Sequence, residues 1–469
     1  MSNRAAEEVD VVDVVVIGLG PGGEYVAGRL AEAGLAVVGV EAELVGGECP
    51  YWGCVPSKMM IRAGNLLAEA RRVPGMAGAA RVEPDWTPVA APIRDEATDD
   101  WDDRVAAERL TGKGGRLVRG RGRLAGPGRV SVAAQSAGEA AREFTARRGV
   151  VLATGSRPQI PPVPGLAGAP YWTNREAVSA KEAPASLLVL GGGSIGVELA
   201  QVYARFGTRV TVVEALERLV PAEEPEAAEL LAGILRKEGM ELRTGARAAE
   251  VRHDGGEFTL VLADGTRLTG ERLLVATGRR PDLGELGLET VGLDPAARAL
   301  PVDGRMRAAP GLWGVGDMTG HGAFTHVAIH EAEIAVRDVL GRGGPDADYR
   351  ALPRVTFTDP EIGAVGLTEE QARERGLRVR TALSRVPSSS RGWIHKAGNE
   401  GLVKLVEDAD RGVLVGACSM GPMGGEVLYG LAVAVQAEVP VETLLHMIYA
   451  YPTFHRGVQD ALMALRQRA

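Results

Sequence analysis

Residues 11–41 read VVDVVVIGLGPGGEYVAGRLAEAGLAVVGVE. The stretch begins with a short apolar run over 11–17 that is rich in β-branched residues, which predicts a buried strand. A glycine-rich turn follows, then a helical pattern to about Ala33 and a second apolar run over 36–40 that ends in Glu41. Strand, glycine-rich turn, helix and strand in this order predict a dinucleotide-binding unit.

The same pattern occurs a second time in residues 186–214, which read SLLVLGGGSIGVELAQVYARFGTRVTVVE. A predicted strand over 186–190 leads into the glycine-rich turn, a helix runs to about Phe206, and a strand over 208–213 ends in Glu214. A single glycine fingerprint is a weak signal, whereas two copies that each have an acidic residue some 20 positions on are specific. The chain therefore carries two predicted dinucleotide folds.

The glycines of both turns have the same predicted roles. The first permits the tight bend, the second lets backbone amides approach a pyrophosphate, and the third lets helix and strand pack closely. The helix N-terminus adds unpaired N–H groups and the positive end of its dipole. The glycines in question are Gly18, Gly20 and Gly23 in the first turn and Gly191, Gly193 and Gly196 in the second.

The acids that follow the two turns, Glu41 and Glu214, are expected to accept hydrogen bonds from an adenosine ribose. Ala-Leu-Glu follows Glu214 rather than a cluster of arginines, so a 2′-phosphate would meet a carboxylate with little positive charge to balance it. The second fold is therefore predicted to prefer NADH over NADPH.

Other segments of the sequence predict the strands, helices and domain crossings outside the two dinucleotide-binding units. Residues 150–158 and 273–281 both read as a buried strand, then Ala-Thr-Gly, then a proline, and they are predicted to mark crossings between the two dinucleotide domains. Residues 312–317 predict a strand that ends in Asp317, followed by a helix over 325–340. Beyond it, a separate α+β domain is predicted, with strands at 354–357, 402–406 and 413–418 and helices at 425–437 and 455–465.

Composition limits the class of protein. With 469 residues the chain exceeds one hydrophobic core, and a net charge of −8 argues against a nucleic-acid or anionic-membrane partner. A polar, acidic N-terminus without an apolar run predicts a cytoplasmic protein that does not enter a membrane. The arginines at 116, 119, 121, 123 and 129 are interpreted as the solvated face of a small antiparallel sheet that turns at 126–128.

Residues 47–58 read GECPYWGCVPSK and hold two of the three cysteines of the chain. A helix that starts near Cys54, with Pro56 in its opening turn, would lower the pKa of a thiol at its N-terminus. Gly53 permits the bend that brings Cys49 and Cys54 within bridging distance. A purely structural disulfide is improbable in a reducing compartment, and zinc would need a second Cys or His pair, whereas Cys418 stands alone. A redox-active pair is the remaining alternative.

These residues carry a resemblance to a known family. GGECPYWGCVPSK over 46–58, the two glycine fingerprints, both Ala-Thr-Gly segments and Gly-Val-Gly-Asp over 314–317 resemble the flavin-dependent pyridine nucleotide-disulfide oxidoreductases. Dihydrolipoamide dehydrogenase, glutathione reductase and mercuric reductase are members. The resemblance runs from about residue 11 to the C-terminus. It implies FAD on the first fold, NAD on the second, and a homodimer formed through the C-terminal domain. No metal site is predicted, because the cysteine pair lacks a second Cys or His pair.

The resemblance also implies roles for individual residues. Cys54 would be the thiolate next to the flavin, Cys49 the interchange thiol that faces the substrate, and Lys58, paired with Glu198, would lie near the flavin N5 edge. Asp317 would hold the ribityl chain of FAD. Further cofactor-binding residues are expected in the two Ala-Thr-Gly segments, namely Thr154, Gly155 and Gly278.

One motif departs from the family pattern. Disulfide-reducing members carry a C-terminal His-Pro-x-x-x-Glu dyad whose His is the acid/base for the thiols across the dimer interface, whereas this chain has Tyr451 at the His position and Arg456 at the Glu position. A tyrosine with a pKa near 10 is a poor base at neutral pH. His455 is a candidate replacement, although it lies about one helical turn away. Mercuric reductase also has a tyrosine near this position, but this chain lacks that enzyme's C-terminal cysteine pair.

The predicted fold is α/β, with two Rossmann-like domains and a C-terminal α+β dimerisation domain like that of glutathione reductase. The predicted activity passes electrons from NADH through flavin and the Cys49–Cys54 pair to a disulfide or another soft acceptor. Reduction of a metal ion or quinone, and a flavoprotein subunit with mainly a binding role, are the alternatives. The predicted domains are 1–157 and 281–346 for FAD, 158–280 for NAD and 347–469 for the interface.

Overall fold

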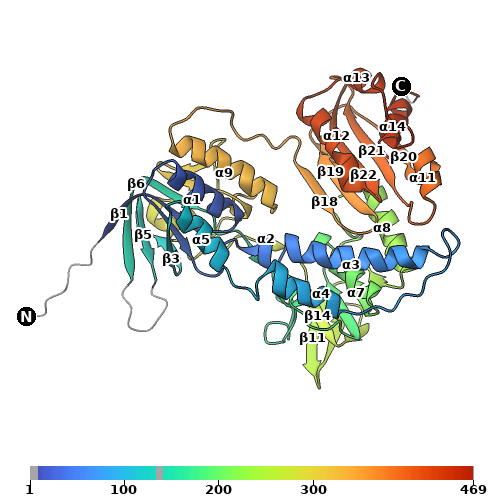
Figure 1. The fold of residues 1–469 in the computed structure, drawn as a ribbon, viewed down its shortest axis with the longest axis horizontal. Coiled ribbons are helices and arrows are strands. Elements are labelled where there is room, and N and C mark those ends of the chain that lie inside the picture. The colour runs from blue at the N-terminus through green and yellow to red at the C-terminus, as the bar shows by residue number, and fades with distance from the viewer. Residues whose placement is uncertain (1–8, 134–140, 468–469) are drawn as a thin grey trace, which may run out of the picture. The chain divides into compact units, whose positions relative to one another are not determined.

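The computed structural model of the chain describes residues 9–133 and 141–467, and it has the mixed α/β fold that the sequence predicts. The chain divides into two compact units, each assembled from separate segments (Figure 1). The first contains the residues up to Pro56, Ala91–Gln159 and Gly278–Asp348, and the second contains Ser57–Ala90, Ile160–Thr277 and the residues from Tyr349 on.

The first unit is built on a sheet with the strand order β16-β17-β6-β1-β2-β3. Its centre is parallel: β1 pairs in parallel with β2 on one side and with β6 on the other. A central parallel strand is covered on both faces of its sheet, which explains why residues 11–17 of β1 are almost all apolar. The strands are β1 (Asp10–Ile17), β2 (Val37–Glu41), β3 (Arg116–Arg119), β6 (Arg142–Leu152), β16 (Arg307–Ala309) and β17 (Leu312–Gly314).

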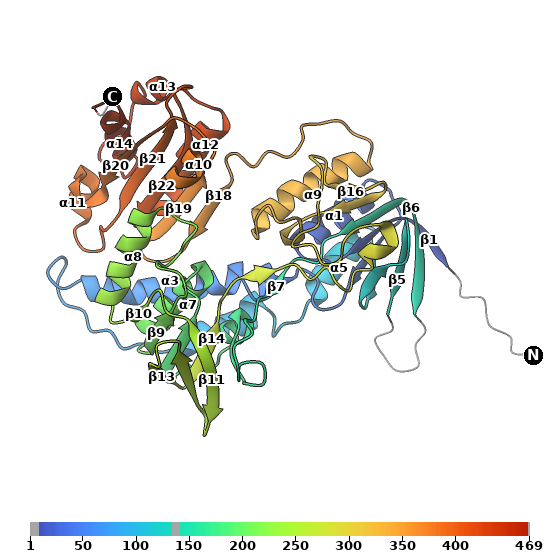
Figure 2. The same ribbon diagram turned by 180° about the vertical axis from the view of Figure 1, so that it is seen from behind.

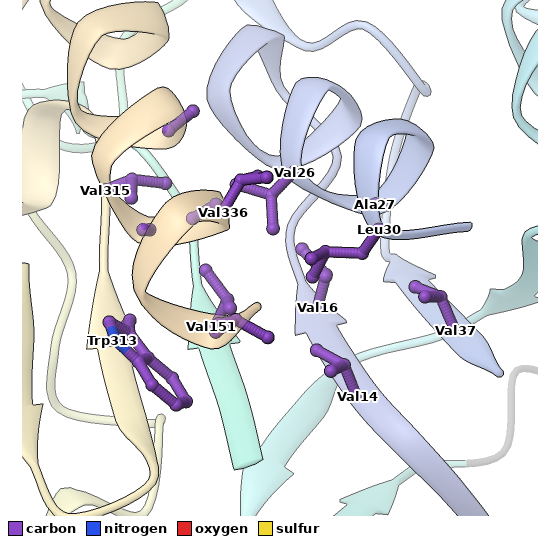
Figure 3. Close-up of a cluster of buried hydrophobic side chains, with 14 of the residues drawn as sticks. Val14, Val16, Val26, Ala27, Leu30, Val37, Val151, Trp313, Val315 and Val336 are labelled. Carbon is purple, nitrogen blue, oxygen red and sulfur yellow. The ribbon is translucent and has the colours of Figure 1, made fainter. Parts of the chain in front are cut away.

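Helices α1 (Pro21–Glu32) and α9 (Thr325–Val339) lie against this sheet and against each other. Figure 3 shows Val26 and Leu30 of α1 above Val14 and Val16 of β1, with Val336 of α9 beside them. The apolar residues of α1 recur at helical spacing, so one stripe of the helix is buried. Further helical elements of this unit are α2 (Glu48–Tyr51), η1 (Ile93–Ala97), α5 (Arg104–Gly112), η2 (Leu288–Val291) and η3 (Asp317–Thr319). Helices α3 (Cys54–Arg72) and α4 (Thr87–Pro92) cross the boundary and belong mostly to the second unit.

The arginine-rich segment is only partly what the sequence predicted. Strands β4 (Gly122–Leu124) and β5 (Arg129–Val132) form the expected antiparallel hairpin, and β5 continues onto β6. Strand β3, however, pairs in parallel with β2, so Arg116 and Arg119 belong to the main sheet. The prediction was wrong here because alternation of residues gives no information about strand direction. Arg119 also binds Asp103 instead of facing only solvent.

The two Ala-Thr-Gly segments meet in a short antiparallel ladder, β7 (Arg157–Pro158) with β15 (Arg279–Arg280). The strand predicted to end in Asp317 instead ends at Gly314, because the chain turns after β17 into the 3₁₀ helix η3. The amide of Gly316 donates to the buried carboxylate of Glu331 on α9 at 2.6 Å, which holds this turn. Asp317 therefore lies just beyond the carboxyl end of β17.

The second unit contains the second predicted dinucleotide fold. Its parallel sheet has the order β10-β9-β8-β14, and a three-stranded antiparallel meander, β11-β12-β13, accompanies it (Figure 2). The meander was not predicted from the sequence. The strands are β8 (Ser186–Leu190), β9 (Arg209–Val213), β10 (Glu241–Arg243), β11 (Ala248–Asp254), β12 (Glu257–Leu262), β13 (Arg267–Gly270) and β14 (Arg272–Val275), and the helices are α6 (Asn174–Val178), α7 (Ser194–Arg205) and α8 (Pro225–Lys237).

The C-terminal part of the second unit is an antiparallel sheet in the order β18-β19-β22-β21-β20, with α12 and α14 packed on it. This is the predicted α+β domain, although the sequence did not indicate β19, β20 or the shorter helices. The strands are β18 (Pro353–Thr356), β19 (Glu361–Gly366), β20 (Val379–Arg385), β21 (Leu402–Asp408) and β22 (Val413–Gly421), and the helices are α10 (Glu369–Glu374), η4 (Val386–Ser388), α11 (Ser390–His395), α12 (Gly424–Gln436), α13 (Val441–Leu445) and α14 (Arg456–Gln467).

Candidate active site

The first glycine-rich turn has the three local geometries that a dinucleotide cradle needs. Gly18 has a positive φ of 89°, and a Cβ added there would lie 2.5 Å from the carbonyl oxygen of Ala153. A Cβ on Gly23 would overlap the carbonyl oxygen of Gly18, so only glycine lets α1 approach β1 this closely. At Gly20 an added Cβ would meet no heavy atom of the described residues within 4 Å. That open side, at the N-terminus of α1, lets backbone amides approach a pyrophosphate.

The second turn repeats this geometry position by position. Gly191 has a φ of 110°, and a Cβ there would overlap the carbonyl oxygen of Ala276. A Cβ on Gly196 would overlap the carbonyl oxygen of Gly191, whereas at Gly193 it would meet no described heavy atom within 4 Å. The N-terminus of α7 is therefore open in the same way as that of α1. Both turns fit the diphosphate of a dinucleotide.

Each of the two acids, Glu41 at the end of β2 and Glu214 just after β9, is hydrogen-bonded to its own glycine-rich turn. Glu41 accepts a hydrogen bond from the amide of Leu19 at 2.6 Å, and Glu214 accepts one from the amide of Gly192 at 2.6 Å. Each carboxylate also accepts from the backbone two residues further on, at 2.8 Å in both cases. Burial raises the pKa of Glu41, although these backbone hydrogen bonds act against the rise. Each carboxylate is thus fixed at its glycine-rich turn by two backbone hydrogen bonds and could hold an adenosine ribose there.

Asp317 belongs to a polar network that sequence reasoning missed. The hydroxyl of Ser156 donates to Asp317 at 2.5 Å, and the guanidinium of Arg279 donates to the Ser156 hydroxyl at 3.0 Å and to its carbonyl at 2.7 Å. Arg279 also forms an ion pair with Glu48 at 3.4 Å. The network thus connects Asp317 with the residue that precedes Cys49. The sequence signal for this network is the polar residue that follows each Ala-Thr-Gly, which is Ser156 in one segment and Arg279 in the other.

Thr154, Gly155 and Gly278, which the resemblance assigned to cofactor binding, lie at the two crossings. Thr154 and Gly155 follow β6, and the Thr154 hydroxyl is 3.9 Å from the sulfur of Met318. Gly155 and Gly278 have positive φ values of 67° and 109°. Glycine is required at both for its conformational freedom.

The structure brings Cys49 and Cys54 together, with their side chains hydrogen-bonded to each other and not joined by a disulfide. Cys49 lies in the short helix α2, and Cys54 is the first residue of the long helix α3. The φ of Gly53 is not in the left-handed region; instead, a Cβ there would lie 3.2 Å from the carbonyl oxygen of Glu48, so Gly53 serves close packing. The hydrogen bond with Cys54 and burial raise the pKa of Cys49 far above its ordinary value. A raised pKa keeps the Cys49 thiol protonated at neutral pH.

Thr325 is a second residue that sequence reasoning missed. Its hydroxyl oxygen lies 3.4 Å from the sulfur of Cys54 and also forms a hydrogen bond with Cys49, which lowers the pKa of Cys49 against the two larger effects. Thr325 is the first residue of α9, so the N-termini of α3 and α9 both lie at the thiols. Two helix dipoles with their positive ends at one sulfur favour a thiolate there.

Lys58 and Glu198 form the pair that the resemblance implied. The ammonium group of Lys58 lies 2.9 Å from the carboxylate of Glu198, and the other carboxylate oxygen accepts from the amide of Phe357 at 2.8 Å. The Phe357 ring covers the same ammonium group at 4.5 Å. Lys58 follows Cys54 by four residues on α3, which places both on one side of that helix. Glu198 is buried, so this contact fixes the lysine side chain.

The C-terminal segment that departs from the family pattern lies at the surface of the second unit. Tyr451 is 67% exposed and Ile448 is 99% exposed. The guanidinium of Arg456 lies 5.4 Å from the centroid of the Tyr451 ring. His455 precedes α14 and lines a cavity of about 280 Å³ between α12, α13 and the segment that carries Tyr451.

The third cysteine is unsuited to chemistry. Cys418 lies in β22 with an exposed fraction of 1%, and burial raises its pKa. Within residues 9–133 and 141–467, no three His, Cys, Asp or Glu side chains gather as a metal-binding group. The helices of these residues also include none that is long and apolar enough to cross a membrane.

Comparison with known proteins decides the family. The family model described as pyridine nucleotide-disulphide oxidoreductase matches residues 12–332, and the dimerisation domain of the same family matches residues 352–462. The chain belongs to this family. It is therefore a flavin-dependent pyridine nucleotide-disulfide oxidoreductase, an enzyme of a family that uses FAD and NAD(P)H, as the resemblance implied.

Similar proteins cover nearly the whole oxidoreductase. Dihydrolipoyl dehydrogenase of Thermus scotoductus is 35% identical over 97% of this chain and 98% of its own length. Mercuric reductase of Acidithiobacillus ferrooxidans is 32% identical over 96% of this chain and 81% of its own length.

Solved structures of similar proteins have the same fold. LpdA of Mycobacterium tuberculosis superimposes with a TM-score of 0.84 at 29% identity, over 97% of this chain and all of that one. The Cu(II) complex of the HOCl-induced flavoprotein disulfide reductase RclA of Escherichia coli gives 0.85 at 26% identity, over 97% and 99%.

Proposed function

We propose that this oxidoreductase passes electrons from NADH to a disulfide or another soft acceptor, with Cys49 and Cys54 as the redox pair. The observation that carries the proposal is the pair of mutually hydrogen-bonded thiols at the N-terminus of α3, with the Thr325 hydroxyl against them. In the cycle, two electrons and two protons open the Cys49–Cys54 bond to two thiols, and the acceptor closes it again.

The remaining residues are assigned to binding and orientation. The first glycine-rich turn with Glu41 fits the ADP half of FAD, and the second with Glu214 fits that of NADH. FAD, when bound, supplies the two-electron exchange between nicotinamide and thiols. Asp317 is positioned to hold a polyol hydroxyl. Lys58 is positioned by Glu198 as a fixed positive charge one turn along the helix from Cys54.

The division into domains at residues 157, 280 and 346 also remains our proposal, as does the cytoplasmic location. We propose a homodimer that forms through the C-terminal domain. The family match to a dimerisation domain and the exposed apolar side chains of Tyr429, Val433 and Ile448 support it. Sedimentation of the purified enzyme distinguishes the dimer from a monomer.

Reduction of a soft metal ion is the second candidate, and Tyr451 favours it. Reducing a disulfide consumes two protons, and a tyrosine is a poor group to relay them at neutral pH. Reducing Hg(II) to the metal takes two electrons and no protons, so it places no such demand. Turnover that is rapid with Hg(II) and slow with every small disulfide would favour this candidate, whereas quinone turnover that survives Cys49→Ser would indicate direct transfer without the thiols.

Anaerobic titration of the enzyme with NADH tests the proposed function. We expect two additional titratable thiols per chain after addition of NADH, together with a long-wavelength absorption band, because the pair opens to a thiol and a thiolate. The measurement is a thiol count after denaturation in alkylating reagent, combined with the absorption spectrum. Loss of the flavin absorption without any increase in the number of thiols would show that NADH reduces the flavin without opening a Cys49–Cys54 disulfide, and would contradict the proposed function.

Cofactor preference is a separate prediction. We expect kcat/KM for NADH to exceed that for NADPH by at least about 10-fold, because the buried carboxylate of Glu214 would repel a 2′-phosphate. Glu214→Gln should narrow the ratio, since the amide keeps an acceptor for the Gly192 amide but removes the charge. The matched control is Glu229→Gln on the exposed side of α8, which should leave the ratio unchanged. Equal use of both cofactors by the wild type would contradict the prediction.

A further inference from the structure

The turn that carries Asp317 has a backbone conformation that needs support from outside the turn. Gly316 has a φ of 81° and a ψ of −158°, a region of backbone space that essentially only glycine occupies. Asp317 follows it as the first residue of the 3₁₀ helix η3, and Thr319 is the last. A single short turn of this kind is weak by itself. The direction of the Asp317 side chain therefore depends on what holds the two ends of the turn.

One buried carboxylate holds both ends. Glu331 on α9 is 0% exposed. Its Oε2 accepts from the amide of Gly316 at 2.6 Å, and its Oε1 accepts from the hydroxyl of Thr319 at 2.9 Å. Oε1 also lies 3.1 Å from Nδ1 of His321, just beyond the turn. The contacts of Glu331 thus lie on either side of Asp317 in the chain.

The carboxylate of Asp317 is held separately. The hydroxyl of Ser156 donates to its Oδ2 at 2.5 Å. A carboxylate can accept about four hydrogen bonds, so this contact leaves room for a hydroxyl of a ligand. With the backbone held by Glu331 and the side chain by Ser156, Asp317 is ordered before a ligand arrives. A group that is ordered in advance loses less conformational entropy when it binds.

We propose that Glu331 is a positioning residue for FAD binding that acts through Asp317. The inference rests on the proposed role of Asp317, which is to hold a polyol hydroxyl of FAD. Without an oxygen at position 331, the Gly316 amide and the Thr319 hydroxyl lose this acceptor, the turn relaxes, and Asp317 is no longer ordered in advance. Because the effect passes through Asp317, it cannot exceed the effect of removing the Asp317 carboxylate.

The test measures the dissociation constant of FAD by serial dilution of the purified holoenzyme, with the released flavin quantified by its fluorescence. Glu331→Met has a similar volume but no oxygen, and we expect FAD to bind about 10-fold more weakly, as for one or two lost hydrogen bonds. Glu331→Gln keeps an acceptor for the Gly316 amide and should stay within about 3-fold of the wild type. Glu333→Met, on the exposed side of the same helix, is the matched control and should bind FAD as the wild type does.

A double-mutant cycle shows whether the effect passes through Asp317. Asp317→Ala should weaken FAD binding about 30-fold, as expected for the loss of a hydrogen bond to a charged group. The double variant of Asp317→Ala and Glu331→Met should bind FAD at most about 2-fold more weakly than Asp317→Ala alone, whereas independent effects would multiply to about 300-fold.

The outcomes separate the two claims. A Glu331→Met constant within about 2-fold of the wild type overturns the positioning role, and so does multiplication of the two effects in the double variant. If Glu331→Met does not fold, as judged by thermal unfolding, Thr319→Val decides by the same two criteria; it removes one donor to Glu331 and should weaken FAD binding about 5-fold. An Asp317→Ala constant within about 2-fold of the wild type overturns the proposed role of Asp317 itself, and with it the inference.

Discussion

Replacement of Cys49 by serine is expected to lower NADH-dependent turnover of a disulfide acceptor by at least about 1,000-fold, because a serine hydroxyl cannot exchange with a disulfide sulfur. The effect is large because Cys49 is, in our proposal, the sulfur that the acceptor meets. The measurement is steady-state turnover with lipoamide and with glutathione disulfide, together with flavin content.

The control for this variant is Cys418→Ala, which removes the third thiol from a buried site in β22. Turnover per flavin should stay at the wild-type level there. Cys54→Ser should lose disulfide turnover as completely as Cys49→Ser, since neither sulfur can form the bond alone. Disulfide turnover by Cys49→Ser within 10-fold of the wild type would contradict the proposed pair.

Replacement of Tyr451 by histidine is expected to raise disulfide turnover at neutral pH by about 100-fold, at the lower end of what a positioned acid/base contributes. The reason lies in the thiol. The pKa of Cys49 is raised, so at neutral pH it is protonated in the dithiol and needs a base to become a nucleophile. An imidazole with a pKa near 6.5 can take that proton, whereas a phenol cannot do so efficiently.

The sign of the pH dependence follows from the same shift. A raised pKa leaves little thiolate on Cys49 at neutral pH, so wild-type disulfide turnover should keep rising with pH past 8. In Tyr451→His the rise should instead level off near the pKa of histidine. Trp393→His, at another exposed aromatic residue of the same domain, is the control and should keep the wild-type profile. Unchanged turnover in Tyr451→His would show that the missing base does not limit the reaction.

The parts of the fold that depend on neighbouring residues could be predicted from the sequence. Strand β1, helix α1 and strand β2 followed from the apolar run, the glycines and the helical spacing, because a strand-turn-helix unit is specified within about 30 residues. The same holds for β8, α7 and β9. Strand direction in the arginine-rich segment could not be predicted in this way, because Arg116 pairs with Val38, far away in the chain.

Among the residues of the candidate site, too, only those marked by the local sequence could be predicted. Cys49 and Cys54 could be singled out because they lie five residues apart beside a helix start. Thr325 could not, because its contact with Cys54 joins residues 271 positions apart. The pairing of Lys58 with Glu198, which spans 140 positions, came from the family resemblance and not from the residues themselves.

The duplicated cradle has a consequence for how the enzyme tells its two nucleotides apart. The backbone is open in the same way around Gly20 and around Gly193. In both turns the assigned ribose acceptor is a glutamate, Glu41 or Glu214, that also accepts from the backbone amide two residues further on. Neither loop can therefore distinguish a flavin nucleotide from a nicotinamide nucleotide by the adenylate end. In our proposal, the selection is therefore made by the residues assigned to the other ends of the nucleotides, Asp317 and the Lys58–Glu198 pair.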